Sequence, residues 1–155
     1  MKYIISLVCL SFSYISFGQF QATDKSITKS KYLTEIRLQV THFPFGIKSE
    51  RTLFFDSSNW HASENGEILV VKKDLSLLID ELNKINPGEL KSQSELNLDS
   101  QFGVDDGVHY LFSYKNGDKI KYVTFDNPEL FQKQYPKVKE FEKYMVLVKI
   151  FFKLL

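Results

Sequence analysis

Three histidines are the residues of this chain that could most readily carry out acid–base chemistry. His42, His61 and His109 lie far apart in the sequence, and none sits in a short metal-ligand motif or beside a cysteine. An imidazole in an active site needs a carboxylate within hydrogen-bonding reach in a cleft, which only folding can supply. The sequence therefore supports no metal site and no cofactor.

Signatures of the common catalytic classes do not occur in the sequence. There is no Gly-x-Ser-x-Gly turn, and the seven glycines are scattered rather than gathered in a phosphate-binding loop. Residues 99–103 lack the spaced acidic ligands of a calcium loop, and residues 105–107 read better as a turn. We accordingly assign no catalytic residue and favour a non-catalytic protein.

Aromatic residues in two predicted loops are the candidates for ligand contacts. Phe43 and Phe45 flank a proline in the first loop, and Trp60 and His61 fall in the second. These four residues are the predicted binding residues. For Trp60 a lid on the core is the alternative that we favour, because large rings are usually substantially buried.

The composition describes a folded, nearly neutral domain. The 155 residues include 20 basic and 19 acidic side chains, for a net charge of +1, and 43% are hydrophobic and 15% aromatic. That length suits one domain with its own core, and the aromatic content argues against disorder. Because the chain is not strongly basic, we expect no nucleic-acid partner.

The N-terminus predicts export. Lys2 is followed by an apolar run without charge until Asp24, and Ser16-Phe17-Gly18 offers small residues to a signal peptidase. The run is short for a membrane span, and the early Cys9 after a valine does not fit a lipoprotein site. We expect a periplasmic or secreted protein without a cysteine once the signal is removed.

Three segments follow from this interpretation. Residues 1–18 form the signal peptide, 19–30 a flexible lead-in, and 31–155 a single domain. In the domain, alternation over 32–41 predicts a half-buried strand. A second strand over 51–55 completes an antiparallel hairpin with a longer connection.

A short strand and an amphipathic helix come next. Residues 68–71 are predicted to be a strand that follows a turn at 64–67. Asp74 can cap a helix that ends at Asn86-Pro87-Gly88. The polar segment 89–107 is either a functional loop or a covering strand.

The second hairpin, around Asn116-Gly117, allows two registers. A two-residue turn would place Phe112 opposite Lys121, whereas a three-residue loop with Gly117 as a bulge places Phe112 opposite Ile120 and Tyr110 opposite Tyr122. We choose the second register because it groups the apolar rings on one face.

The C-terminal region predicts helix. Asn127 can cap it, Pro128 lies in its first turn, and Pro136 kinks or restarts it. The apolar stripe over 138–152 is so broad that we favour a helix packed deeply against the sheet. The alternative is an exposed apolar end that docks a partner or a membrane surface, and we disfavour the membrane contact.

Several of these features also resemble a known group of proteins. The helix end Ile85-Asn86-Pro87, the pattern Asp106-Gly107-x-x-Tyr110, the turn Tyr114-x-Asn116-Gly117-Asp118 and the signal end Ser16-Phe17-Gly18-Gln19 are similar to small exported domains of unknown function from Bacteroidota. Some such domains carry Gly-x-Cys-Pro in the first hairpin, where this chain has Phe43-Pro44-Phe45-Gly46. The resemblance implies export and an α+β fold, but no activity.

Together these patterns predict one α+β domain. We expect an antiparallel sheet of about four to five strands, covered on one face by two helices. The favoured function is an exported, non-catalytic binding or envelope-associated protein, whose partner is an unknown protein or envelope ligand. The alternative is a small periplasmic or secreted hydrolase with its site in the 89–107 loop.

Overall fold

A computed structural model of the chain describes residues 25–71, 74–98 and 107–154. In this part of the chain six strands form one antiparallel sheet in the order β4-β3-β2-β1-β5-β6. Their bounds are β1 (Thr34–His42), β2 (Ile47–Phe55), β3 (Trp60–Glu64), β4 (Glu67–Leu69), β5 (Val108–Asn116) and β6 (Lys119–Asp126). The α+β prediction is confirmed, with one strand more than the upper end of the expected range.

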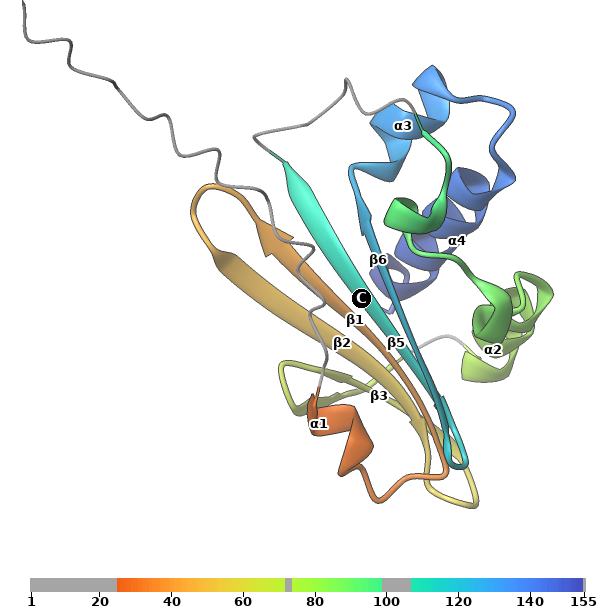
Figure 1. The fold of residues 1–155 in the computed structure, drawn as a ribbon. Helices are drawn as coiled ribbons and strands as arrows, with labels where there is room; N and C mark the ends of the chain where they lie inside the picture. The colour runs from red at the N-terminus through yellow and green to blue at the C-terminus, as the bar shows by residue number, and fades with distance from the viewer. Residues whose placement is uncertain (1–24, 72–73, 99–106, 155) are drawn as a thin grey trace, which may run out of the picture.

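The helices lie on both sides of this sheet (Figure 1). On one face are α2 (Leu75–Lys84), α3 (Pro128–Gln134) and α4 (Lys139–Phe152), and on the other is the single-turn α1 (Lys25–Thr28). Two 3-10 turns, η1 (Pro87–Glu89) and η2 (Gln93–Glu95), follow α2. Three helices cover one face of the sheet, the inner face, whereas two were expected. The difference arises because the chain around Pro136 leaves the helical conformation and restarts as α4.

The core lies between the sheet and the three helices. Strand β1 directs Ile36, Leu38 and Val40 into it, because alternate side chains of a strand share one face. Phe125 of β6 stacks on Tyr144 of α4 with ring centroids 4.3 Å apart. Burying a large apolar side chain contributes about 1.5–3 kcal/mol, so this layer supplies most of the driving force for folding.

Helix α4 is packed against the sheet, as its broad stripe predicts. Phe141, Leu147 and Phe151 are fully buried. Phe152 is half exposed, and the guanidinium of Arg51 lies 4.6 Å from its ring centroid. No helix within the described ranges is long and apolar enough to span a membrane.

Strand β3 was not expected, since its residues were assigned to a loop. Trp60 and His61 open this strand, which pairs with β2 and turns into β4 through Asn65 and Gly66. Both turn residues have positive φ, 50° and 87°, as a two-residue hairpin loop of type I′ requires. The short segment has little β-propensity of its own, so pairing with β2 decides its conformation.

The first hairpin has a shorter connection than expected. Strand β2 begins at Ile47 rather than near residue 51, and only residues 43–46 connect it to β1. The polar start of β2 shows no alternation in the sequence, but it pairs with the end of β1 residue by residue. Gly46 has a φ of 64°, which a residue with a side chain rarely adopts.

The register chosen for the second hairpin is wrong. Asn116 pairs with Lys119, so the turn is Gly117-Asp118, and Phe112 faces Val123 rather than Ile120. Gly117 has a φ of 60° at the first turn position, where a type II′ turn requires glycine. This register buries Val123 and Phe125 in the core and places Ile120 and Tyr122 on the opposite face.

The described part of segment 89–107 covers the edge of β6. The Ser92 hydroxyl accepts a hydrogen bond from the backbone N–H of Thr124 (3.1 Å), and the Gln93 side-chain oxygen accepts one from that of Asp126 (2.9 Å). Leu90 is fully buried. Residues 99–106, on which the hydrolase alternative partly depends, lie outside the described residues.

Asn127 does not cap α3 with its side chain as predicted. It has a φ of 36°, and its Oδ1 accepts a hydrogen bond from the backbone N–H of Val108 at 3.0 Å. The side chain therefore ties the start of α3 to the start of β5, a contact between segments that local sequence does not indicate.

The outer face of the sheet carries a buried charged pair beneath α1. Glu35 and Arg37 of β1 form an ion pair there and are 3% and 9% exposed. Ser26 of α1 hydrogen bonds to Arg37, and Ile27 is fully buried. The described end of the predicted lead-in thus includes the helical turn α1, which covers the pair.

Candidate functional site

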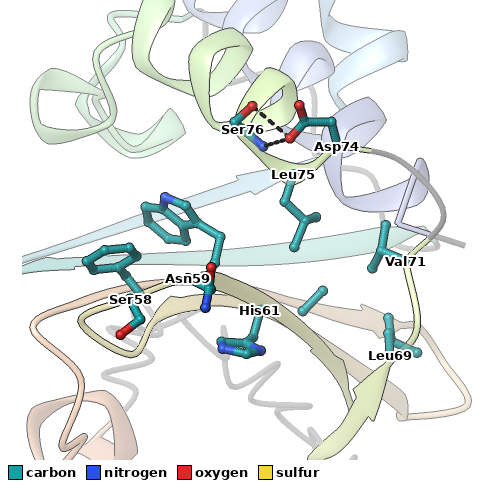
Figure 2. A pocket seen from close by; sticks show the side chains of 11 residues that line it. Ser58, Asn59, His61, Leu69, Val71, Asp74, Leu75 and Ser76 are labelled. Atoms are coloured by element: carbon teal, nitrogen blue, oxygen red, sulfur yellow. Dashed lines mark hydrogen bonds between the residues drawn. The ribbon is translucent and has the colours of Figure 1, made fainter.

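An open groove lies at the sheet edge where β3 and β4 face the start of α2. Its volume is about 510 Å³. Its lining combines apolar and polar side chains. The apolar lining consists of Phe55, Trp60, Ala62, Leu69, Val71 and Leu75, and the polar lining of Ser58, Asn59, His61, Asp74 and Ser76. Figure 2 shows Leu75 pointing from the first turn of α2 towards the sheet.

The turn between β2 and β3 positions one end of the groove. Asp56 Oδ1 accepts hydrogen bonds from the backbone N–H groups of Ser58 and Asn59, both at 2.9 Å. Ser57 is held at a φ of 82°, a left-handed conformation that costs a residue with a Cβ about 1–2 kcal/mol. The turn predicted at 56–59 is therefore present, and its backbone is fixed by Asp56.

The same carboxylate is strongly acidic. The backbone N–H of Asn59, then that of Ser58 and then the His61 ring stabilise its ionised form, and together they lower the pKa of Asp56 to about 2. His61 Nε2 lies 2.6 Å from Asp56 Oδ2. Both oxygens of this carboxylate are thus used to hold the turn.

Trp60 is both a cover on the core and a wall of the groove. Its side chain is partly buried, packs against the hydrophobic core and meets the Phe55 ring at 5.5 Å between centroids. Trp60 lies beyond the end of the pairing between β3 and β4, and its ring also lines the groove. The two interpretations of this residue from the sequence are therefore compatible.

His61 lies on the other face of the sheet from Trp60, because successive strand residues alternate. Its ring stacks on Phe54 with centroids 5.3 Å apart. The residue borders the groove, but the hydrogen bond with Asp56 and the stacking on Phe54 occupy its imidazole.

The start of α2 forms the opposite rim. Asp74 caps the helix as predicted, and its Oδ1 accepts hydrogen bonds from the backbone N–H (2.9 Å) and the hydroxyl (2.7 Å) of Ser76. These bonds, the one from the hydroxyl first, lower the pKa of the Asp74 carboxyl. This side of the groove therefore carries a fixed negative charge.

The structure does not bring all predicted binding residues together. Phe43 and Phe45 are 51% and 80% exposed in the β1–β2 connection. Trp60 and His61 lie at the opposite end of β2, and a nine-residue strand spans about 30 Å. Of the four, only Trp60 and His61 border the groove.

Two of the three histidines lie within hydrogen-bonding distance of a carboxylate. Besides the pair of His61, His109 Nδ1 lies 2.5 Å from Asp126 Oδ1 across β5 and β6 on the outer face. His42 is exposed at the end of β1. In residues 25–71, 74–98 and 107–154, no three His, Cys, Asp or Glu side chains gather as a metal ion would require.

Apart from Trp60 and His61, the sequence predicted none of the groove residues as binding residues. Those missed are Phe55, Ser58, Asn59, Ala62, Leu69, Val71, Asp74, Leu75 and Ser76. Leu69 and Val71 were assigned to a strand and Leu75 to the apolar face of a helix, which predicts burial rather than binding. The sequence does contain one signal. Residues 68–71 are four consecutive apolar residues, whereas a strand with one buried face needs apolar residues only at alternate positions.

Comparison of the chain with protein-family models, with curated proteins and with solved structures finds no match.

Proposed function

We propose that this chain is an exported, non-catalytic binding protein whose ligand occupies the groove beside Trp60. The observation that carries the proposal is the groove itself. A hollow of about 510 Å³ has the size typical of ligand sites, and its lining offers both apolar side chains and polar groups to a ligand.

The frame of the groove supports binding rather than turnover. Asp56 and His61 hold the β2–β3 turn, and Asp74 holds the first turn of α2, so these polar side chains already have structural partners. A rigid rim limits the conformational entropy lost when a ligand binds, which favours affinity.

Trp60 is the only tryptophan of the chain and so reports directly on the groove. We would titrate the protein with defined probes, namely short peptides, oligosaccharides and phospholipid vesicles, and follow tryptophan fluorescence. Ser76→Arg places a long charged side chain at the rim and should weaken binding at least tenfold. Leu77→Arg is the matched control, since Leu77 is 63% exposed and does not line the groove.

Two results would contradict the proposal. One is that no probe class gives a saturable change in fluorescence. The other is that Ser76→Arg and Leu77→Arg bind equally well, which would place the ligand elsewhere.

Export is tested separately. The apolar run after Lys2 and the small residues before Gln19 support it. Protein expressed with its own N-terminus in a bacterial host should be found outside the cytoplasm, and N-terminal sequencing should begin at Gln19. A cytoplasmic protein that retains Met1 would refute this part of the proposal.

A hydrolase is the second candidate, favoured by the short contact between His109 and Asp126. A carboxylate on Nδ1 leaves Nε2 free to act as a base, and Thr41 is the next residue along this row of the sheet. Ester and peptide substrates should then be cleaved by the wild type and not by His109→Ala. Equal rates for both proteins would remove this candidate.

A further inference from the structure

We infer that the ligand of the groove is an extended polypeptide segment that adds to the free edge of β4 as another strand. This inference rests on the proposed binding function and names the chemical class of its ligand.

Strand β4 presents unused backbone groups. Its strand partner in the described chain is β3, and the pair Glu64–Glu67 closes a two-residue turn, so the backbone groups of that pair face each other. Backbone direction alternates along a strand. The N–H and C=O groups of Ile68 therefore point away from β3. The N–H of Val70, the residue after the strand, does so too, because it lies in the same planar peptide as the Leu69 C=O, which faces β3.

The two edge strands of the sheet, β6 and β4, differ in how their outward backbone groups are covered. On β6, side chains of Ser92 and Gln93 occupy outward N–H groups, as described above. Ile68 of β4 is 62% exposed, and Val70, which directly follows the strand, is 96% exposed. Since proteins normally cover or charge such edges, an open apolar edge beside a groove points to a partner that pairs with it.

The backbone groups identify the partner as polypeptide. Alternating donors and acceptors at a repeat of about 6.6–6.8 Å, two residues of a strand, match another extended backbone. Leu69 of β4 and Val71, which lies two residues after the strand ends, both line the groove, so a strand laid against this edge places alternate side chains at the groove rim.

A second copy of the chain is a poorer occupant. Strand β4 has three residues, and two such edges would bury far less than the roughly 1,200 Å² of a stable interface. A peptide can contact both the edge and the groove, and it needs no symmetry.

The test uses a phage-displayed library of random 12-residue peptides selected on the protein. Ile68→Pro removes an outward N–H without removing a hydrogen bond to β3, and Ile68→Thr keeps the N–H while replacing the apolar side chain. Val70→Pro makes the same change at the next outward position. Far-ultraviolet circular dichroism confirms that each variant is folded.

Selected peptides should bind the wild type and Ile68→Thr within about threefold of each other. Both proline variants should bind at least tenfold more weakly. Two versions of a selected peptide are then compared, one N-methylated at every odd-numbered residue and one at every even-numbered residue. Only one version should lose binding, because the N–H groups of alternate residues lie on opposite edges of the added strand and only one edge faces β4.

Other results overturn the inference. Peptides that bind the proline variants as well as the wild type, or that tolerate methylation in both versions, do not pair with β4. Concentration-dependent dimers abolished by Ile68→Pro would identify a second copy as the occupant. If only oligosaccharides or vesicles bind, in a manner sensitive to Ser76→Arg, the binding function stands and the peptide inference fails.

Discussion

Replacing Arg37 by methionine tests the buried charged pair on the outer face. Arg37 contacts the Glu35 carboxylate and Ser26, and it lies 3.6 Å from Glu50. Methionine keeps most of the side-chain length but removes the charge. The change therefore leaves the Glu35 carboxylate, 3% exposed, without its cation.

The expected cost follows from that burial. Removing one partner of a buried ion pair destabilises a protein by about 3–5 kcal/mol, because the remaining charge is desolvated and unpaired. The Ser30 hydroxyl still bonds to Glu35, which places the expected loss near the lower end, about 3 kcal/mol. Glu50 adds little, since its side chain is 31% exposed and its interaction is screened by water.

The free energy of unfolding can be measured in urea from the fluorescence of Trp60. The double variant with Glu35→Leu removes both charges and should recover stability to within about 1 kcal/mol of the wild type. A loss below about 1 kcal/mol for Arg37→Met alone would show that water reaches Glu35, and it would refute the reasoning.

Three further predictions concern pH and packing. Burial raises the pKa of Tyr144 above its ordinary 10.0, so the unfolded state ionises first and stability should fall by about 1.4 kcal/mol per pH unit above pH 10; urea midpoints of Tyr144→Phe should lack this slope. The Asp56 carboxyl should titrate by NMR near pH 2, so its stabilisation of the turn persists above pH 4 and is lost as pH falls towards 2, whereas a midpoint near 3.8 would contradict its hydrogen bonds. Gly107→Ala should lose about 1–3 kcal/mol in thermal unfolding, because its Cβ would lie 2.2 Å from the Asn127 side chain; the control Gly88→Ala, whose nearest contact is 3.9 Å, should change stability by less than about 0.5 kcal/mol, and equal effects would refute the clash.

Local patterns predicted the elements that have a strong period or a distinct end signal. The alternation of β1 correctly separated Ile36 and Leu38 from Glu35 and Arg37, and Asp74 correctly marked the start of α2. These features depend on neighbours in the chain, so the sequence contains them directly.

Pairing between distant segments was predicted less well. The turn of the second hairpin is Gly117-Asp118, one residue later than Asn116-Gly117, because a type II′ turn requires glycine at its first position. The resulting register buries Val123 and Phe125 in the core. Strand β3 was missed because its conformation comes from β2. Both errors arise where the energy of a partner strand outweighs local preference.

The candidate site shows the same division. Trp60 was recognised as a candidate contact from its type alone. The groove around it depends on where α2 returns to the sheet, which brings Leu75 opposite Leu69 and Trp60. No local pattern indicates that return.

By itself the sequence determined the α+β class and the faces of its most regular elements, and it is the source of the proposal of export. Those properties follow from composition and from periodicity along neighbouring residues. The tertiary structure decided which edge of the sheet is open, which histidines meet carboxylates and where a groove forms. These depend on contacts between segments far apart in the chain, whose energies are summed only when the whole domain folds.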